Sequence, residues 1–150
     1  MERTITLGID KAREFYLSGN KDLKALALSA FSEDELVVAG LPTSVAEFTE
    51  KYGCTGFLNP REIDEYEAHA MLRKLRDLYR GCDEYEYRER LGHGYQYCIV
   101  LMHDHNMGDY LHISELNPEY NEFLSFNDYK VAEKFLACFE GLIEKAGNLI

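Results

Sequence analysis

The chain has 150 residues, a hydrophobic content of 46% and a charged content of 29%. This length suits one domain, residues 1–150, and the composition is that of a folded globular protein rather than a disordered chain. The formal net charge of −11 argues against binding nucleic acid through its phosphates, because that mode needs clustered Lys and Arg. No apolar run approaches a membrane span and the N-terminus lacks the pattern of a secretory signal, so we expect a cytoplasmic protein with no membrane partner.

The negative charge is spread along the sequence rather than confined to a tail. It amounts to −3 over residues 1–60, −6 over 61–120 and −2 over 121–150. Such a surface keeps a protein soluble, and it also complements a partner protein with a basic surface. Both interpretations stay open on charge alone.

The first half of the chain carries repeated helix-start signals. Four residues that commonly cap helices precede helix-period patterns: Asp10, Asn20, Ser32 and Ser44. Glu35 and Glu47 follow the two serines at the spacing of a capping box. We therefore expect a series of short helices up to Gly53, preceded at residues 4–9 by a short strand or a simple lead-in.

A long central helix is expected next. Asn59 followed by Pro60 is a strong start signal, and the apolar stripe that follows runs to about Arg80, where Gly81 ends it. Residues 83–94 then read as a charged, tyrosine-bearing connector without a clear conformation. The central helix is the natural packing partner for the last helix of the chain.

A β-hairpin is the clearest strand signal in the sequence. We expect strands at 95–102 and 109–116, joined by a tight turn in which Asn106 pairs with Asp109. In this register His103 faces His112, and one face of the hairpin rests on the helices. That face carries Cys98, Val100, Met102, Leu111 and Ile113.

The C-terminal stretch combines a third strand with a long amphipathic helix. Residues 122–126 predict the strand, and Asn127 or Asp128 caps a helix that runs to the end of the chain. Its apolar stripe includes Phe135 and Phe139. The expected fold is therefore α+β in one domain, with short N-terminal helices, a long central helix, an antiparallel sheet of about three strands and the C-terminal helix packed on it.

Three histidines form one candidate metal site. In the expected register His103, His105 and His112 share a face near the hairpin tip, with Asp104 or Asp109 near enough to complete a coordination sphere. Zinc is the ion that such ligands suit. The alternative is an exposed polar hairpin whose histidines bind nothing.

Motifs of common enzyme classes are absent, so we expect no catalytic residues and no enzyme activity. The sequence has no Gly-x-Ser-x-Gly elbow, no Walker A loop, no GxGxxG and no HExxH. Cys54, Cys82, Cys98 and Cys138 stand singly, which is typical of small buried side chains rather than disulfides. Cys82 or Cys98 with His93 is the one nucleophile arrangement available, and nothing local lowers either thiol's pKa.

Tyrosine and acidic residues gather in the connector. The chain holds 11 tyrosines and no tryptophan, and tyrosine is favoured at protein interfaces because it offers rigid apolar area with a polar tip. We therefore predict partner-contact residues in this stretch: Asp83, Glu84, Tyr85, Glu86 and Tyr87. Packing of these rings at the margin of the core, or against a second copy of the chain, are the alternatives.

The two ends of the sequence and part of the central helix carry a resemblance. Residues 9–36, 72–79 and 123–150 are similar to a group of small uncharacterised proteins of gut Bacteroidota and their phages, including crAss-like phages. Members often carry tryptophans after the central helix, where this chain has Cys82, Tyr85 and Tyr87. The resemblance implies an accessory protein of a phage or mobile element, acting in the host cytoplasm, and it implies no catalytic residue.

These observations lead to one expected function and two alternatives. We expect a small acidic, non-enzymatic protein that binds, or binds and inhibits, a protein with a basic surface. The first alternative is a metal-binding or ligand-binding protein that uses the histidines of the hairpin. The second is a component or cargo of the phage particle.

Overall fold

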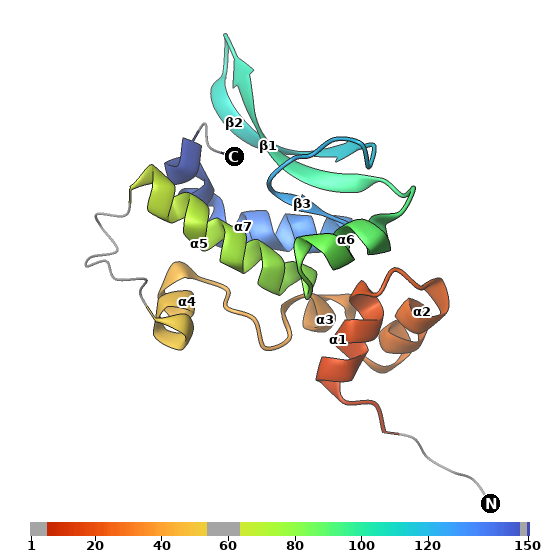
Figure 1. Cartoon of the computed structure of the whole chain (residues 1–150). Coiled ribbons are helices and arrows are strands. Elements are labelled where there is room, and N and C mark those ends of the chain that lie inside the picture. The colour runs from red at the N-terminus through yellow and green to blue at the C-terminus, as the bar shows by residue number, and fades with distance from the viewer. Residues whose placement is uncertain (1–5, 54–63, 148–149) are drawn as a thin grey trace, which may run out of the picture.

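The computed structural model describes residues 6–53, 64–147 and 150. It confirms an α+β fold in which helices precede, flank and follow a three-stranded antiparallel sheet (Figure 1). In this sheet β1 (Gln96–Asp104) lies between β2 (Gly108–Leu116) and β3 (Ser125–Phe126). In the described ranges, no helix is long and apolar enough to cross a bilayer.

Four short helices make up the N-terminal half, as the capping signals predict. They are α1 (Ile9–Leu17), α2 (Lys21–Ala30), α3 (Glu33–Val38) and α4 (Val45–Tyr52). Asn20, Ser32 and Ser44 cap α2, α3 and α4 through their side chains, and Ser32 with Glu35 completes a capping box. The predicted cap at Asp10 is wrong: the N-cap of α1 is Gly8, two residues earlier, which leaves Asp10 in the first turn, where a carboxylate interacts favourably with the helix dipole.

Helix α5 (Glu65–Arg80) is the predicted central helix with a later start. The expected start at Asn59 and Pro60 lies outside the described residues. Asp64 has an extended backbone and its side chain accepts a hydrogen bond from the Glu67 amide, so it is the cap of the described helix. The predicted stop at Gly81 is confirmed by its left-handed conformation, with φ at 71°.

The predicted connector after Gly81 is a helix. Asp83 caps α6 (Glu84–Leu91) by accepting from the Glu86 amide, and arginines follow glutamates at four-residue spacing along it. Such pairs stabilise a helix that has no apolar stripe of its own. The lack of that stripe is the reason why periodicity did not predict α6.

The hairpin forms with a different register. Strands β1 (Gln96–Asp104) and β2 (Gly108–Leu116) pair so that Asp104 lies opposite Gly108 and Leu101 opposite Leu111. The Asp104 carboxylate accepts hydrogen bonds from the amides of Asn106 and Met107, and Gly108 takes a positive φ of 78°. These interactions stabilise a three-residue loop at 105–107 rather than the predicted two-residue turn.

An odd register shift exchanges the faces of one strand relative to the other. The odd-numbered residues of both strands therefore share the face that packs on the core around α5 and the C-terminal helix, where Ile99 is 2% exposed. The prediction that Cys98, Val100 and Met102 lie on this face is wrong, while that for Leu111 and Ile113 is confirmed. Cys98 is buried on the opposite face, beside β3 (Ser125–Phe126), which has two residues rather than the predicted five.

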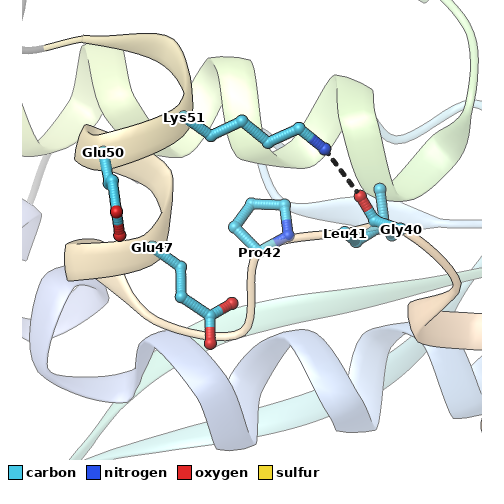
Figure 2. A pocket seen from close by; sticks show the side chains of 6 residues that line it. All are labelled: Gly40, Leu41, Pro42, Glu47, Glu50 and Lys51. Atoms are coloured by element: carbon cyan, nitrogen blue, oxygen red, sulfur yellow. Dashed lines mark hydrogen bonds between the residues drawn. The ribbon is translucent and has the colours of Figure 1, made fainter.

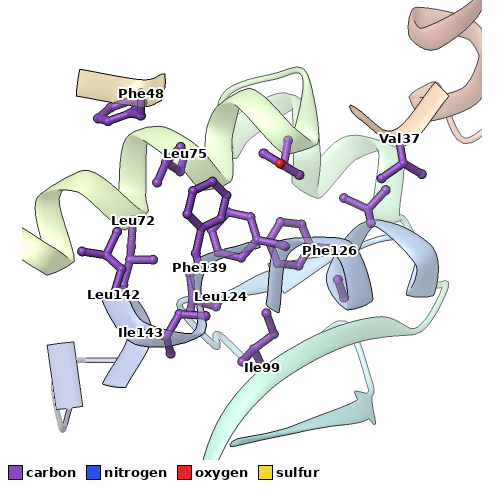
Figure 3. Close-up of a cluster of buried hydrophobic side chains, with 14 of the residues drawn as sticks. Val37, Phe48, Leu72, Leu75, Ile99, Leu124, Phe126, Phe139, Leu142 and Ile143 are labelled. Atoms are coloured by element: carbon purple, nitrogen blue, oxygen red, sulfur yellow. The ribbon is translucent and has the colours of Figure 1, made fainter. Parts of the chain in front are cut away.

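The core is built around α7 (Tyr129–Ala146), which lies between α5 and the sheet (Figure 1). Asp128 caps α7, as the sequence indicates, and the predicted stripe of Phe135, Phe139, Leu142 and Ile143 is buried. Figure 3 shows side chains of α5, α7 and β1 meeting in this cluster. The Phe135 ring lies edge-on to that of Tyr79 of α5, with 5.2 Å between the ring centroids, and its centroid is 5.0 Å from that of Phe126 of β3.

Truncating Phe135 should therefore weaken the packing of α7 against both α5 and β3. We expect Phe135→Ala to lower the free energy of unfolding by about 3–5 kcal/mol, because it leaves a cavity in a fully buried aromatic cluster. Chemical denaturation followed by circular dichroism measures this loss. The control is Tyr66→Ala on α5, whose side chain is 76% exposed and whose loss should cost less than about 0.5 kcal/mol; equal effects would contradict the assigned core.

Candidate functional site

The three histidines of the predicted metal site are not brought together. His103 lies opposite Asp109, with its Nδ1 2.7 Å from the carboxylate, while His112 lies opposite Val100. His103 and His112 therefore project from opposite faces of the hairpin, and His105 lies in the turn. Within the described ranges, no group of three or more His, Cys, Asp or Glu side chains could hold a metal ion.

The predicted contact residues on α6 have different surroundings from one another. Asp83 is the helix cap and Tyr85 is 73% exposed. Glu86 is partly exposed and pairs with Arg90 at 2.7 Å. Tyr87 is 1% exposed, with the Arg80 guanidinium 3.6 Å above its ring, so it is unavailable to a partner and its prediction as a contact residue is wrong.

Glu84 belongs to an internal network of arginines. Its carboxylate pairs with Arg80, whose side chain is 1% exposed, with Arg88 at 3.0 Å, and with Arg76 at 3.7 Å. Burial by itself would raise the pKa of Glu84, but the hydrogen bonds and charges of Arg80, Arg88 and Arg76 outweigh it and hold the pKa below its usual value. The negative charge of Glu84 is therefore balanced inside the molecule.

The same arginines hold the connection between β2 and β3. Arg80 donates to the Ser125 carbonyl at 2.8 Å and to the Ser125 hydroxyl at 2.7 Å, and Arg76 donates to the Phe123 carbonyl at 3.1 Å. Arg88 donates to the Pro118 carbonyl at 3.1 Å. A guanidinium can satisfy several acceptors in fixed geometry, and it remains charged here even though burial lowers the Arg80 pKa.

The hairpin and the connection that follows it carry acidic charge alone. Residues 91–127, which we call the acidic hairpin, contain no Lys or Arg and five acidic residues: Asp104, Asp109, Glu115, Glu119 and Glu122. In the part of the chain that the structure describes, none of the five forms an ion pair with Lys or Arg. The strand pair also projects away from the helices at its tip (Figure 1).

The predicted contact residues do not include this surface, although the absence of Lys and Arg from residues 91–127 is visible in the sequence. Counting charge over 61–120 combines the arginines of α5 and α6 with a segment that has none. The buried arginines were missed as well. Arg76 and Arg80 stand four residues apart on the side of α5 that also carries Leu72, and a polar residue at such a position signals an internal hydrogen-bond network.

Two clefts lie beside α4. The first, of about 420 Å³, is lined by Gly40, Leu41, Pro42, Glu47, Glu50 and Lys51, and the Lys51 ammonium donates to the Gly40 carbonyl at 3.1 Å across it (Figure 2). The second, of about 730 Å³, lies between α1, α4 and α5. The described residues that line the first cleft include no Cys, Ser, Thr or His, and burial raises the pKa of the Cys82 thiol in the second.

The buried Cys98 is not activated. Burial raises the pKa of Cys98 to about 11, so its thiol stays protonated at neutral pH. Cys82, Cys98 and Cys138 carry free thiols, while Cys54 lies outside the described residues.

A scan against protein-family models and searches of curated proteins and of solved structures each gave no match.

Removing Arg80 should loosen the base of the acidic hairpin. We expect Arg80→Ala to cost about 3 kcal/mol of unfolding free energy, since it deprives the buried Ser125 of two hydrogen bonds from a charged donor. Amide hydrogen exchange should also accelerate at residues 117–125. Arg73→Ala, an exposed arginine of the same helix, is the matched control and should change stability by less than about 0.5 kcal/mol. Unchanged exchange at 117–125 in Arg80→Ala would contradict the clamp.

Glu84 should make the protein sensitive to acid. Its pKa in the folded state lies below the ordinary value of 4.5, so the unfolded chain binds the proton first and stability falls as pH drops through that range. We expect Glu84→Gln to destabilise the protein at pH 7, and the difference in unfolding free energy from wild type to shrink as the pH falls below the ordinary carboxyl pKa of 4.5. Urea denaturation across this range measures it, with Glu140→Gln on the exposed side of α7 as control. A difference that does not vary with pH would contradict the pairing with Arg80.

Proposed function

We propose that this chain is a non-enzymatic binding protein for a partner protein with a basic surface, and that the acidic hairpin makes the contact. The observation that supports it most directly is the unbalanced charge of residues 91–127 on a projecting hairpin. Single-signed charge on an exposed element steers an oppositely charged partner and selects against partners of like charge.

Ion pairs within the chain favour the acidic hairpin rather than α6 as the surface that contacts a basic partner. Glu84 and Glu86 of α6 are each compensated by arginines of the same chain. A basic partner would have to displace those arginines to use these carboxylates. Glu115 and Glu119 are exposed and have no such competitor among the described residues.

The biological setting is part of the same proposal. The resemblance to proteins of gut Bacteroidota and their phages suggests an accessory protein that acts on a host factor. A host protein that handles nucleic acid would present the basic surface that this hairpin complements.

Neutralising the hairpin should reduce binding to a basic probe. The probe is an immobilised deca-lysine peptide, and the variant is Asp109→Asn, Glu115→Gln, Glu119→Gln and Glu122→Gln combined. The control combines Glu50→Gln, Glu65→Gln, Glu140→Gln and Glu144→Gln, which changes the net charge equally at exposed sites elsewhere. In biolayer interferometry we expect the hairpin variant to bind about tenfold more weakly than the control, equivalent to about 1.4 kcal/mol.

Raising the salt concentration should reduce the difference in affinity between the two variants, because salt screens exposed charges. Circular dichroism would verify that both variants are folded. Equal losses in the two variants would show that only the total charge matters, and the proposal would then be abandoned.

A further inference from the structure

Strand β2 has a free edge along its whole length. It has nine residues, all paired with β1 in a continuous register without a bulge, and it lies at the outside of the sheet. No strand pairs with its outer side in the part of the chain that the structure describes. Natural proteins usually protect such edges with Lys, Pro, a bulge or a covering segment, and β2 contains no Lys and no Pro.

The direction of the β2 backbone groups follows from one hydrogen bond. The Ile99 amide donates to the Leu124 carbonyl at 2.8 Å, so Ile99 directs its backbone groups away from β2. Opposite residues in an antiparallel pair either both bond each other or both point away. Ile113, opposite Ile99, therefore directs its amide and carbonyl outward, and so do the residues at two-residue intervals from it: Asp109, Leu111 and Glu115.

The side chains of these four residues share the helix-facing side of the sheet. Leu111 and Ile113 are half-buried at the margin of the core, while Asp109 and Glu115 are exposed at either end. A strand added here would place its own side chains opposite them in the order acid, apolar, apolar, acid. The complement is a segment with basic, apolar, apolar and basic residues at every second position.

We propose that the free edge of β2 takes up an extended basic segment of the partner as a fourth, antiparallel strand. The inference rests on the proposed function and adds the mode of binding and the sequence pattern of the bound segment. Backbone hydrogen bonds from the outward groups of β2 hold the segment, and its alternate side chains supply the selectivity.

A second copy of this chain is a poor occupant of the same edge. In an antiparallel pair of two β2 strands centred on His112, Asp109 of each copy would lie opposite Glu115 of the other. Like charges directly opposite each other destabilise a strand pair. A basic segment turns both contacts into attractions.

The experiment uses the full chain and a peptide that reads the same in both directions, Lys-Thr-Val-Thr-Val-Thr-Lys with blocked ends. Two derivatives keep its charge and composition. One is N-methylated at both valines, whose amides face β2 in the antiparallel arrangement, and the other at the first and third threonines, whose amides face away. NMR titration of labelled protein gives the three dissociation constants.

We expect methylation of the valines to weaken binding at least tenfold and methylation of the threonines to change it less than threefold. The unmodified peptide should also slow hydrogen exchange at the amides of Leu111, Ile113 and Glu115. Equal binding of the two methylated peptides would overturn strand addition while leaving the proposed function intact, because charge attraction does not need the amides. Absence of binding by the unmodified peptide up to millimolar concentration would overturn it as well.

Two further measurements distinguish a basic segment from the other possible occupants of the β2 edge, an acidic segment and a second copy of this chain. A peptide with Glu in place of both Lys should bind at least tenfold more weakly, and equal binding would overturn the proposed function together with this inference. Light scattering should show a monomer. A dimer whose Leu111 and Ile113 amides are already protected would assign the edge to a second copy and overturn the inference.

Discussion

The ring of Phe135 joins the two halves of this fold. It lies edge-on to Tyr79 of α5, is tilted against Phe126 of β3, and contacts Phe139 one turn further along α7. Helix α7 is thereby packed on both sides. The apolar sides of α5 and of the sheet are each buried against α7 rather than against one another. The Tyr79 hydroxyl donates to the Pro42 carbonyl at 2.8 Å and ties the segment before α4 to the same cluster. The apolar core therefore fixes how α5, α7 and the sheet lie relative to one another.

Arginine side chains fix the segment before β3, which lies at the margin of the apolar core. Arg76, Arg80 and Arg88 extend from α5 and α6 to the backbone carbonyls between β2 and β3. Arg13 in the same way donates to the Tyr79 carbonyl at the end of α5, at 3.0 Å. Several arginines of the chain are thus used in internal hydrogen bonds, and the carboxylates of the hairpin have no Lys or Arg partner among the described residues.

The proposed binding mode combines two requirements that the hairpin meets together. A free strand edge offers directional hydrogen bonds to any extended chain, which gives affinity with little selectivity. The exposed Asp109 and Glu115 at the two ends of that edge, with half-buried Leu111 and Ile113 between them, restrict the bound segment to one pattern. The same charges disfavour self-pairing, which is the usual hazard of an unprotected edge.

The sequence by itself determined the elements that depend on local interactions. The caps at Asn20, Ser32, Ser44 and Asp128, the stop at Gly81 and the stripe of α7 are all fixed by contacts within a few residues, and all are confirmed. Tertiary structure decided the rest. Helix α6 has no extended apolar stripe because ion pairs with arginines, together with the buried Tyr87 and Leu91, attach it to the body of the protein. The hairpin register depends on the hydrogen bonds of the Asp104 side chain in the turn, on the positive φ of Gly108 and on the packing of Ile99 in the core. The observed register differs by three residues from the predicted one, and this difference places His103 and His112 on opposite faces. Side-chain alternation in a strand is a local property, but the residue that each one faces is set by the partner strand and the core beneath it.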